Sequence, residues 1–201
     1  MKKIAIVLFD DVEVLDFAGP FEVFSVTGRR KLGEPYEVFT TAEKETVIAR
    51  NGLQITVTHT FNNCPQPDIF LIPGGGGYHA DGAPFGSRRE MNNPVMLNWI
   101  KSYADKSEFI LSVCTGALIL ANAGMLDNLE ATTHFLAVDT LKQIAPRTRV
   151  SPEKRYVDNG KIILSAGVSA GIDMSFYMVE KMQGKEVSLE TARYMQYDYW
   201  K

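Results

Sequence analysis

Apolar residues gather in short continuous runs along the chain, and three of these runs predict buried strands. They are Ile4–Phe9, Asp68–Ile72 and Phe109–Val113. A continuous run suits a parallel strand covered on both faces, whereas a strand with one wet face alternates apolar and polar positions. Two further strands are predicted at Tyr36–Ala42 and at Gln54–Thr58, of which the second alternates.

Helical patterns lie between and after these strands. A proline in the first turn and the stop signal of Gly28 predict a helix over Pro20–Val26. Strands that alternate with helices indicate an α/β fold, a doubly wound and mostly parallel sheet with helices on both faces. Four more helices are expected, at Pro94–Tyr103, Thr115–Ala123, Ile172–Met182 and Ser188–Tyr197.

One segment departs from this alternation. Arg155–Ser165 is predicted to form a hairpin around Asp158-Asn159-Gly160, residue types that tolerate positive φ. The chain has no internal repeat, low-complexity segment or long linker, and its 201 residues suit one domain. We therefore expect a single domain over residues 1–201.

The composition is typical of a globular protein. With 45% hydrophobic and 22% charged residues the chain can bury a sizeable core, and its net charge of −3 comes without the basic run of a nucleic-acid binder. Its two cysteines, Cys64 and Cys114, form no disulfide framework, which favours a reducing compartment. The apolar run from Ile4 stops at Asp10, too short for a signal peptide, and Ile110–Leu126 is broken by polar residues and glycines. We expect a cytoplasmic protein with no membrane or nucleic-acid partner.

Candidate chemistry follows each buried strand. Ligands of such sheets bind in the crevice outside the carboxyl ends of the strands. Asp16 lies shortly after the first strand, Pro73–Gly77 follows the second, and Cys114 follows the third. An acid, a glycine-rich segment and a thiol are thus expected to meet at one edge of the sheet. Loops such as Tyr78–Ser87 would supply the walls of a pocket for a small-molecule substrate.

Cys114 is the leading candidate nucleophile. It ends a strand, and a helix is expected to start at once with Thr115-Gly116-Ala117, the strand–turn–helix arrangement that exposes a nucleophile. A helix N-terminus favours the thiolate, so we predict a pKa below that of a free thiol. The alternative is a small buried core thiol.

The glycines and Asp16 each have two interpretations. Pro73–Gly77 is neither a P-loop nor a dinucleotide fingerprint, so it is a flexible turn or a backbone nest that stabilises an anion. Asp16 lies among apolar neighbours, which predicts partial burial and a raised pKa. It is therefore either a general acid or base, or a cap for the helix near Gly19-Pro20.

The histidines and the tail carry weaker signals. His134 is a candidate base for Cys114, but between threonines and a phenylalanine it is more typical of a structural residue. His59 and His79 lack metal-ligand spacing, so we expect no metal and no cofactor. The aromatic tail is expected to pack on a helix or on another subunit; its members are Tyr194, Tyr197, Tyr199 and Trp200.

Four segments together resemble the ThiJ/PfpI superfamily, a flavodoxin-like group related to class I glutamine amidotransferases. The likeness extends over nearly the whole chain. It implies a flavodoxin-like fold, a nucleophile elbow at Cys114, and a homodimer with the cysteine near the interface. The segments are Ile72–Gly75, Ser112–Ala117, Ala131–His134 and Ser165–Met174.

The branch is indicated by the residue after the cysteine. Superfamily members likened to proteases and deglycases carry histidine there, whereas this chain has Thr115. Together with Leu15-Asp16 ahead of Gly19-Pro20, this pattern resembles the isonitrile hydratase branch. It also resembles the sensor domains of regulators that fuse this fold to a DNA-binding module. The chain ends at Lys201, so we expect no such module here.

The resemblance implies roles for the candidate residues. Cys114 would be the nucleophile and Asp16 the acid and base. Gly75 and Thr115 would give backbone N–H groups to the developing anion, and the Thr115 hydroxyl would orient Asp16 or a water. The implied activity is a lyase that hydrates isonitriles to N-substituted formamides through a Cys114 thioimidate. The alternatives are a non-catalytic redox or ligand sensor, or a hydrolase of small amides or glyoxal-type carbonyls, against which Thr115 argues.

Overall fold

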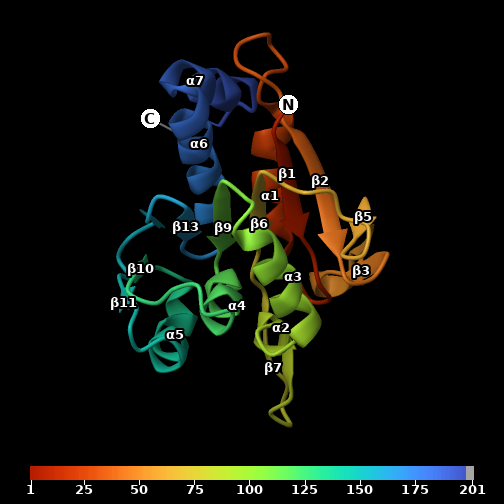
Figure 1. Ribbon diagram of the computed structural model, residues 1–201, viewed down its shortest axis with the longest axis vertical. Helices are drawn as coiled ribbons and strands as arrows, with labels where there is room; N and C mark the ends of the chain where they lie inside the picture. Colours follow the sequence, from red (N-terminus) through yellow and green to blue (C-terminus); the bar gives the residue numbers. More distant parts are fainter. Residues whose placement is uncertain (198–201) are drawn as a thin grey trace.

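A seven-stranded sheet forms the centre of the molecule in the computed structural model, which describes residues 1–197. Neighbouring strands are parallel except at one edge, where β12 runs antiparallel to β13. The predicted doubly wound, mostly parallel sheet and its closing hairpin are therefore confirmed. In sheet order the strands are β12 (Tyr156–Asp158), β13 (Ile162–Ser165), β9 (Phe109–Val113), β6 (Ile69–Ile72), β1 (Lys3–Val7), β2 (Glu37–Ala42) and β5 (His59–Thr60) (Figure 1).

Helices cover both faces of this sheet. On one face α1 packs against α6, and α7 packs against both. On the other face α4 contacts β6 and β9, and Trp99 of α3 meets Phe70 of β6 edge to face. The helices are α1 (Val14–Val26), α2 (Ser87–Glu90), α3 (Pro94–Ala104), α4 (Gly116–Asn122), α5 (Val138–Ile144), α6 (Ala170–Gln183) and α7 (Lys185–Tyr194), with 3-10 turns η1 (Arg50–Gly52) and η2 (Phe135–Ala137).

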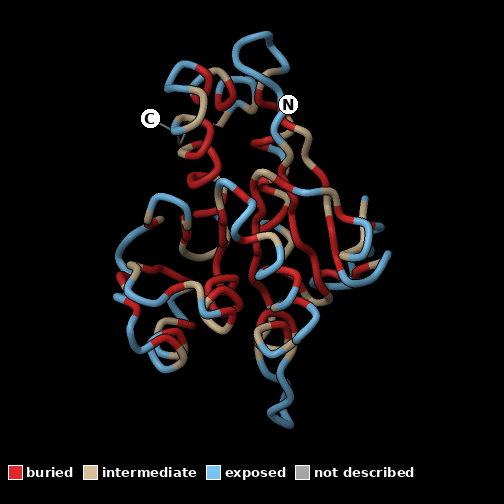
Figure 2. The backbone as a smooth tube through the Cα atoms, in the orientation of Figure 1, coloured by how far each residue is buried: buried red, intermediate tan, exposed pale blue. Residues whose placement is uncertain are grey.

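Three small two-stranded sheets lie outside the main sheet. Figure 2 shows buried backbone through the centre of the molecule, while the hairpin of β7 and β8 carries an exposed tip. The pairs are β3 (Thr46–Ile48) with β4 (Gln54–Thr56), β7 (Gly76–Tyr78) with β8 (Pro84–Gly86), and β10 (Glu130–Ala131) with β11 (Arg149–Val150). Among the residues described, no helix is long and apolar enough to cross a membrane.

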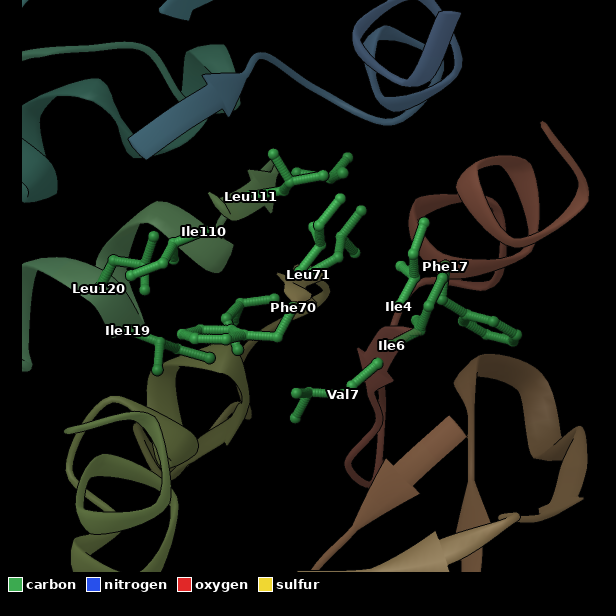
Figure 3. Packing of buried hydrophobic residues seen from close by; sticks show 14 of the residues in the cluster. Ile4, Ile6, Val7, Phe17, Phe70, Leu71, Ile110, Leu111, Ile119 and Leu120 are labelled. Atoms are coloured by element: carbon green, nitrogen blue, oxygen red, sulfur yellow. The ribbon is translucent and has the colours of Figure 1, made fainter. Parts of the chain in front are cut away.

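The continuous apolar strands are buried on both faces because alternate side chains enter two separate layers. Strand register places the side chains of β1, β6 and β9 in matching rows. One layer includes Ile4, Ile6, Leu71 and Leu111 with Phe17 of α1 (Figure 3). The other includes Val7, Phe70 and Ile110 with Ile119 and Leu120 of α4 (Figure 3).

The first helix starts earlier than expected. The proline signal predicted Pro20–Val26, whereas α1 begins at Val14 and holds Pro20 in its interior. Proline has no N–H to donate to the carbonyl four residues earlier, that of Asp16, which is why it usually marks a helix start. Here tertiary packing against α6 keeps the helix continuous through the proline. Asp16 consequently belongs to the first turn of a helix.

The aromatic tail is described in part. Tyr197 stacks on Phe176 of α6, with 5.3 Å between ring centroids, as expected for helix packing. Tyr199 and Trp200 lie outside the described residues.

Candidate active site

Cys114 occupies a sharp turn between β9 and α4. Its φ of 56° is in the left-handed region, which a residue with a Cβ adopts at a cost of about 1–3 kcal/mol. Three hydrogen bonds hold it there. The Cys114 N–H donates to the carbonyls of Ala166 at 3.0 Å and Ser165 at 3.2 Å, and the Thr133 hydroxyl donates to the Cys114 carbonyl at 2.8 Å. The elbow predicted from the sequence is therefore present and tied to the neighbouring strand.

The glycine-rich loop after β6 packs directly on this elbow. A Cβ on Gly74 would lie 2.4 Å from the Thr115 nitrogen, and a Cβ on Gly75 would lie 2.3 Å from the Glu13 nitrogen. Gly75 also has a φ of 117°, which side-chain-bearing residues rarely adopt. Glycine is required at both positions because the loop touches the start of α1 on one side and the elbow on the other. These contacts place the three predicted segments at the end of the sheet toward which β1 and β2 point, beside α2 and α4 (Figure 1).

The Thr115 hydroxyl connects the elbow to the glycine loop. It accepts a hydrogen bond from the Gly75 N–H at 3.0 Å and lies 2.8 Å from the hydroxyl of Ser87. Ser87 also donates to the Gly75 carbonyl at 2.7 Å. Because the Gly75 N–H is engaged by Thr115, its role as a donor to a developing anion stays a prediction.

Asp16 lies behind the elbow with no exposed surface. Its Oδ2 accepts a hydrogen bond from the Gly74 N–H at 2.9 Å, so the carboxyl is bonded to the loop after β6. The residue that caps α1 is Glu13, and it does so without a side-chain hydrogen bond. The interpretation of Asp16 as a helix cap is therefore wrong. Burial raises the pKa of Asp16 to about 7, against the opposing effects of the Gly74 N–H and of the neighbouring Cys114 side chain. The other carboxyl oxygen, Oδ1, is buried without a hydrogen-bond partner among the described residues.

Cys114 and Asp16 form a coupled pair. Burial, and then the charge of Asp16, raises the pKa of Cys114 to about 12. The prediction of a lowered thiol pKa is therefore wrong. Backbone N–H groups of Val168 and Thr115 do favour the thiolate, as expected at a helix start, but the loss of solvation outweighs them. Near neutral pH the pair carries at most one negative charge, and that charge resides on the carboxyl.

A cavity of about 250 Å³ opens onto the sulfur. Asp16 is not among the residues that line this cavity. Its carboxyl contacts Cys114, which does line it. The cavity walls also include polar and charged side chains from four segments outside the Cys114–Thr115 elbow. The lining includes Glu13, Arg50, Arg88, Cys114, Thr115, His134 and Val168.

The histidines have the surroundings of structural residues. His134 lines the cavity, and its Nδ1 accepts a hydrogen bond from the Leu136 N–H at 3.3 Å, which caps η2. Burial and the nearby Arg88 lower the pKa of His134, so the ring is neutral at pH 7. His79 is exposed on the β7–β8 hairpin, and His59 packs against Phe39. Within residues 1–197, no three His, Cys, Asp or Glu side chains gather as a metal site requires.

Several residues that line the cavity were missed from the sequence, among them Val168 and Arg88. Val168 contributes a backbone N–H from a turn where its φ is 43°, and a backbone donor leaves no signal in residue type. Arg88 comes from α2 and directly follows the Tyr78–Ser87 loop. That loop was expected to supply the walls of the pocket, but it contributes none of the residues that line this cavity. The Arg88-Arg89 pair after the glycine loop was the available signal, although it does not reveal which arginine enters the cavity.

Comparison with known protein families gives the same fold as the structure. Residues 2–181 match the DJ-1/PfpI family. This chain belongs to the DJ-1/PfpI family. The ThiJ/PfpI resemblance and the flavodoxin-like fold inferred from sequence are confirmed with it.

Similar proteins within the family differ in what they do. The isonitrile hydratase of Pseudomonas putida is 30% identical over 194 residues, covering 96% of this chain and 76% of the hydratase. The transcriptional regulator GbdR of Pseudomonas aeruginosa is 24% identical over 198 residues, covering 98% of this chain and 51% of the regulator. This chain therefore spans about half the length of that regulator.

Solved structures share the fold. A ThiJ/PfpI family protein from Pseudomonas syringae superposes with a TM-score of 0.83 and 27% identity, covering 98% of this chain and 75% of the other. Drosophila melanogaster DJ-1beta gives a TM-score of 0.79 at 18% identity, with 97% of each chain covered.

Proposed function

We propose that this protein is a cysteine-dependent isonitrile hydratase that converts small isonitriles to N-substituted formamides. The observation that carries the proposal is the buried contact between the Cys114 thiol and the Asp16 carboxyl, whose pKa lies near 7. Hydration of an isonitrile requires a nucleophile and a proton at the same terminal carbon. A thiol paired with a carboxyl that titrates near neutral pH supplies both from one place. The similarity to the P. putida hydratase supports the same reaction.

In the first half of the reaction Asp16 transfers the thiol proton to the substrate. The Asp16 carboxylate accepts the proton of Cys114 as the sulfur attacks the terminal carbon. The protonated carboxyl then gives this proton to that carbon, and a thioimidate, R–N=CH–S, is covalently bound to Cys114. The backbone N–H groups of Thr115 and Val168 stabilise the negative charge on sulfur during the attack.

In the second half water enters and the enzyme is restored. Asp16, again a carboxylate, takes a proton from water as the oxygen bonds to the thioimidate carbon, and then gives this proton to the nitrogen. The carbon–sulfur bond of the tetrahedral adduct then breaks as its hydroxyl proton passes through Asp16 to the sulfur, which releases R–NH–CHO and restores the Cys114 thiol. The sum is one isonitrile and one water consumed for one formamide formed.

The similarity to GbdR favours a second candidate, a sensor in which Cys114 is modified without turnover. In that case a peroxide would oxidise the thiol to a sulfenic acid and be reduced to water, and a partner would detect the change. Glyoxal-type chemistry is the weaker alternative, because Thr115 takes the place of the histidine that follows the cysteine in the deglycase-like members.

Turnover of an aromatic isonitrile tests the proposal. We expect formamide to accumulate by chromatography with the wild-type protein and to be absent with Cys114→Ala. Cys64→Ala is the matched control, because Cys64 is also a buried free cysteine but bonds to the Pro65 carbonyl away from the cavity. Formamide at equal rates from wild type and Cys114→Ala would refute the proposal. No formamide from either, with ready peroxide oxidation of Cys114, would favour the sensor.

A further inference from the structure

Arg88 brings a guanidinium into the Cys114 cavity without a carboxylate partner. The residue is half-buried in α2, and its side chain lines the cavity beside Cys114 and His134. Its Nη1 lies 3.4 Å from the Ser87 hydroxyl, a contact at the limit of a hydrogen bond. No described carboxylate forms an ion pair with it. Burying a cation in this way is unfavourable unless an anion or several acceptors compensate it.

The other arginines nearby are compensated. Arg89, the next residue, pairs with Asp11 at 3.2 Å and with Glu90 at 2.8 Å. Arg50 shares the cavity with Arg88 but pairs with Glu13 at 3.7 Å. Of the two arginines that line the cavity, Arg88 is the one without an ion pair to a described carboxylate.

The groups around Arg88 do not cancel its charge at neutral pH. His134 is neutral, because burial and Arg88 itself lower its pKa. The Cys114 thiol holds its proton, and the carboxylate of Asp16 lies behind the sulfur and bonds to Gly74. Burial lowers the pKa of Arg88, which reflects the loss of solvation, although the guanidinium stays protonated. The guanidinium of Arg88, which lines the cavity without an ion pair to a described carboxylate, therefore favours an anionic group beside it.

We propose that Arg88 makes the Cys114 cavity a binding site for small carboxylates, so that the substrate is an isonitrile bearing a carboxylate group. The guanidinium binds the carboxylate through two parallel N–H donors, while the reactive carbon lies at the sulfur. The isonitrile part rests on the proposed function, whereas the carboxylate subsite belongs to the cavity itself. A volume of about 250 Å³ restricts the substrate to a few carbons between the two groups.

Two alkylating reagents of nearly equal size test the subsite without any turnover. Iodoacetate and iodoacetamide react alike: the Cys114 sulfur bonds to the methylene carbon, iodide leaves, and the thiol proton passes to solvent. They differ in that iodoacetate is an anion. We expect the ratio of iodoacetate to iodoacetamide rates at Cys114, measured by mass spectrometry in a Cys64→Ala background, to exceed the ratio for a free thiol. Arg88→Gln should lower the ratio about tenfold, the effect of one charge-assisted hydrogen bond.

Control variants distinguish carboxylate binding by Arg88 from a general effect of charge and from an effect on the thiolate. Arg88→Lys should restore part of the ratio. Arg193→Gln should leave it unchanged, because it removes the same charge from the exposed surface of α7, outside the cavity. Equal ratios in wild type and Arg88→Gln would overturn the proposal. A fall in both rates by the same factor would also overturn it, since Arg88 would then act on the thiolate rather than on the ligand.

Two further measurements cover the cases in which Arg88→Gln does not fold or the protein is not a hydratase. If Arg88→Gln does not fold, butyrate should protect wild-type Cys114 from iodoacetamide more than butyramide does, and equal protection would count against the subsite. In turnover assays an isocyano carboxylate should have a lower KM than its methyl ester. Failure of both compounds to react, with the alkylation ratio intact, would reject the hydratase and retain the carboxylate subsite.

Discussion

The Asp16→Asn substitution separates the proposed catalytic role of this carboxyl from its effect on folding. Asparagine keeps the side-chain oxygen that accepts the Gly74 N–H and removes the group that ionises. Loss of general acid–base catalysis lowers rates by about 100- to 10,000-fold, so we expect formamide formation to fall by at least about 100-fold.

The same substitution should stabilise the protein at alkaline pH. The pKa of Asp16 rises from 3.8 to about 7 on folding. Because the folded state keeps a proton that the unfolded state has lost, the wild-type free energy of unfolding falls as the pH rises from about 4 to 7. At about 1.4 kcal/mol per pKa unit, the wild type loses roughly 4 kcal/mol over this range. Asp16→Asn avoids that loss, so we expect it to be more stable than wild type at pH 8, with a much smaller difference at pH 4.

Urea unfolding of both proteins at pH 4, 6 and 8 measures the effect, with formamide formation assayed at pH 8. Cys114→Ala is a useful control, because it removes activity and leaves the carboxyl in place. A variant that is less stable than wild type at pH 8, or one that retains wild-type activity, would refute the reasoning about Asp16.

Three further predictions concern the elbow and its loop. Gly75→Ala should lower the free energy of unfolding by about 2 kcal/mol or more, seen as a lower Tm, since its Cβ would lie 2.3 Å from the Glu13 nitrogen; an unchanged Tm would contradict the close packing. Alkylation of Cys114 should still accelerate above pH 9, because its pKa lies near 12, and a plateau below pH 8.5 would show an activated thiol instead. Thr115→Val should cost about 1–3 kcal/mol by leaving the buried Gly75 N–H without its acceptor, and Thr115→Ser should recover most of this in urea unfolding; equal losses in both variants would assign the effect to packing of the methyl group.

The fold was predictable because its strands are apolar on both faces. Continuous apolar runs such as Phe109–Val113, separated by helical patterns, are typical of the buried strands of a parallel sheet. The start of α1 was not predictable, since Pro20 carries a strong local signal that packing against α6 overrides. The small hairpin of β7 and β8 was missed as well, because its glycines resemble a turn.

The meeting of Cys114, Asp16 and the glycines and the raised pKa of Asp16 were predictable, whereas the direction of the shift in the Cys114 pKa was not. Cys114, Asp16 and the glycines follow the buried strands, so their meeting at one edge follows from topology. The thiol pKa depends on burial and on the charge of Asp16, which are properties of the packed molecule. Arg88 and Val168 reach the cavity through loop geometry, for which residue type is a poor guide.

The anchoring of Cys114 also determines which parts of the site can vary. Its backbone is hydrogen-bonded to residues 165 and 166 at the end of β13 and to Thr133, so Cys114 belongs to the same cooperative unit as the sheet. The cavity rim is built differently, from η2 with its exposed Leu136 and from Arg88 of the short helix α2. Substitutions at the rim alter what enters without moving the sulfur. The selectivity of the cavity can therefore change, by evolution or by design, while the pair of Cys114 and Asp16 stays intact.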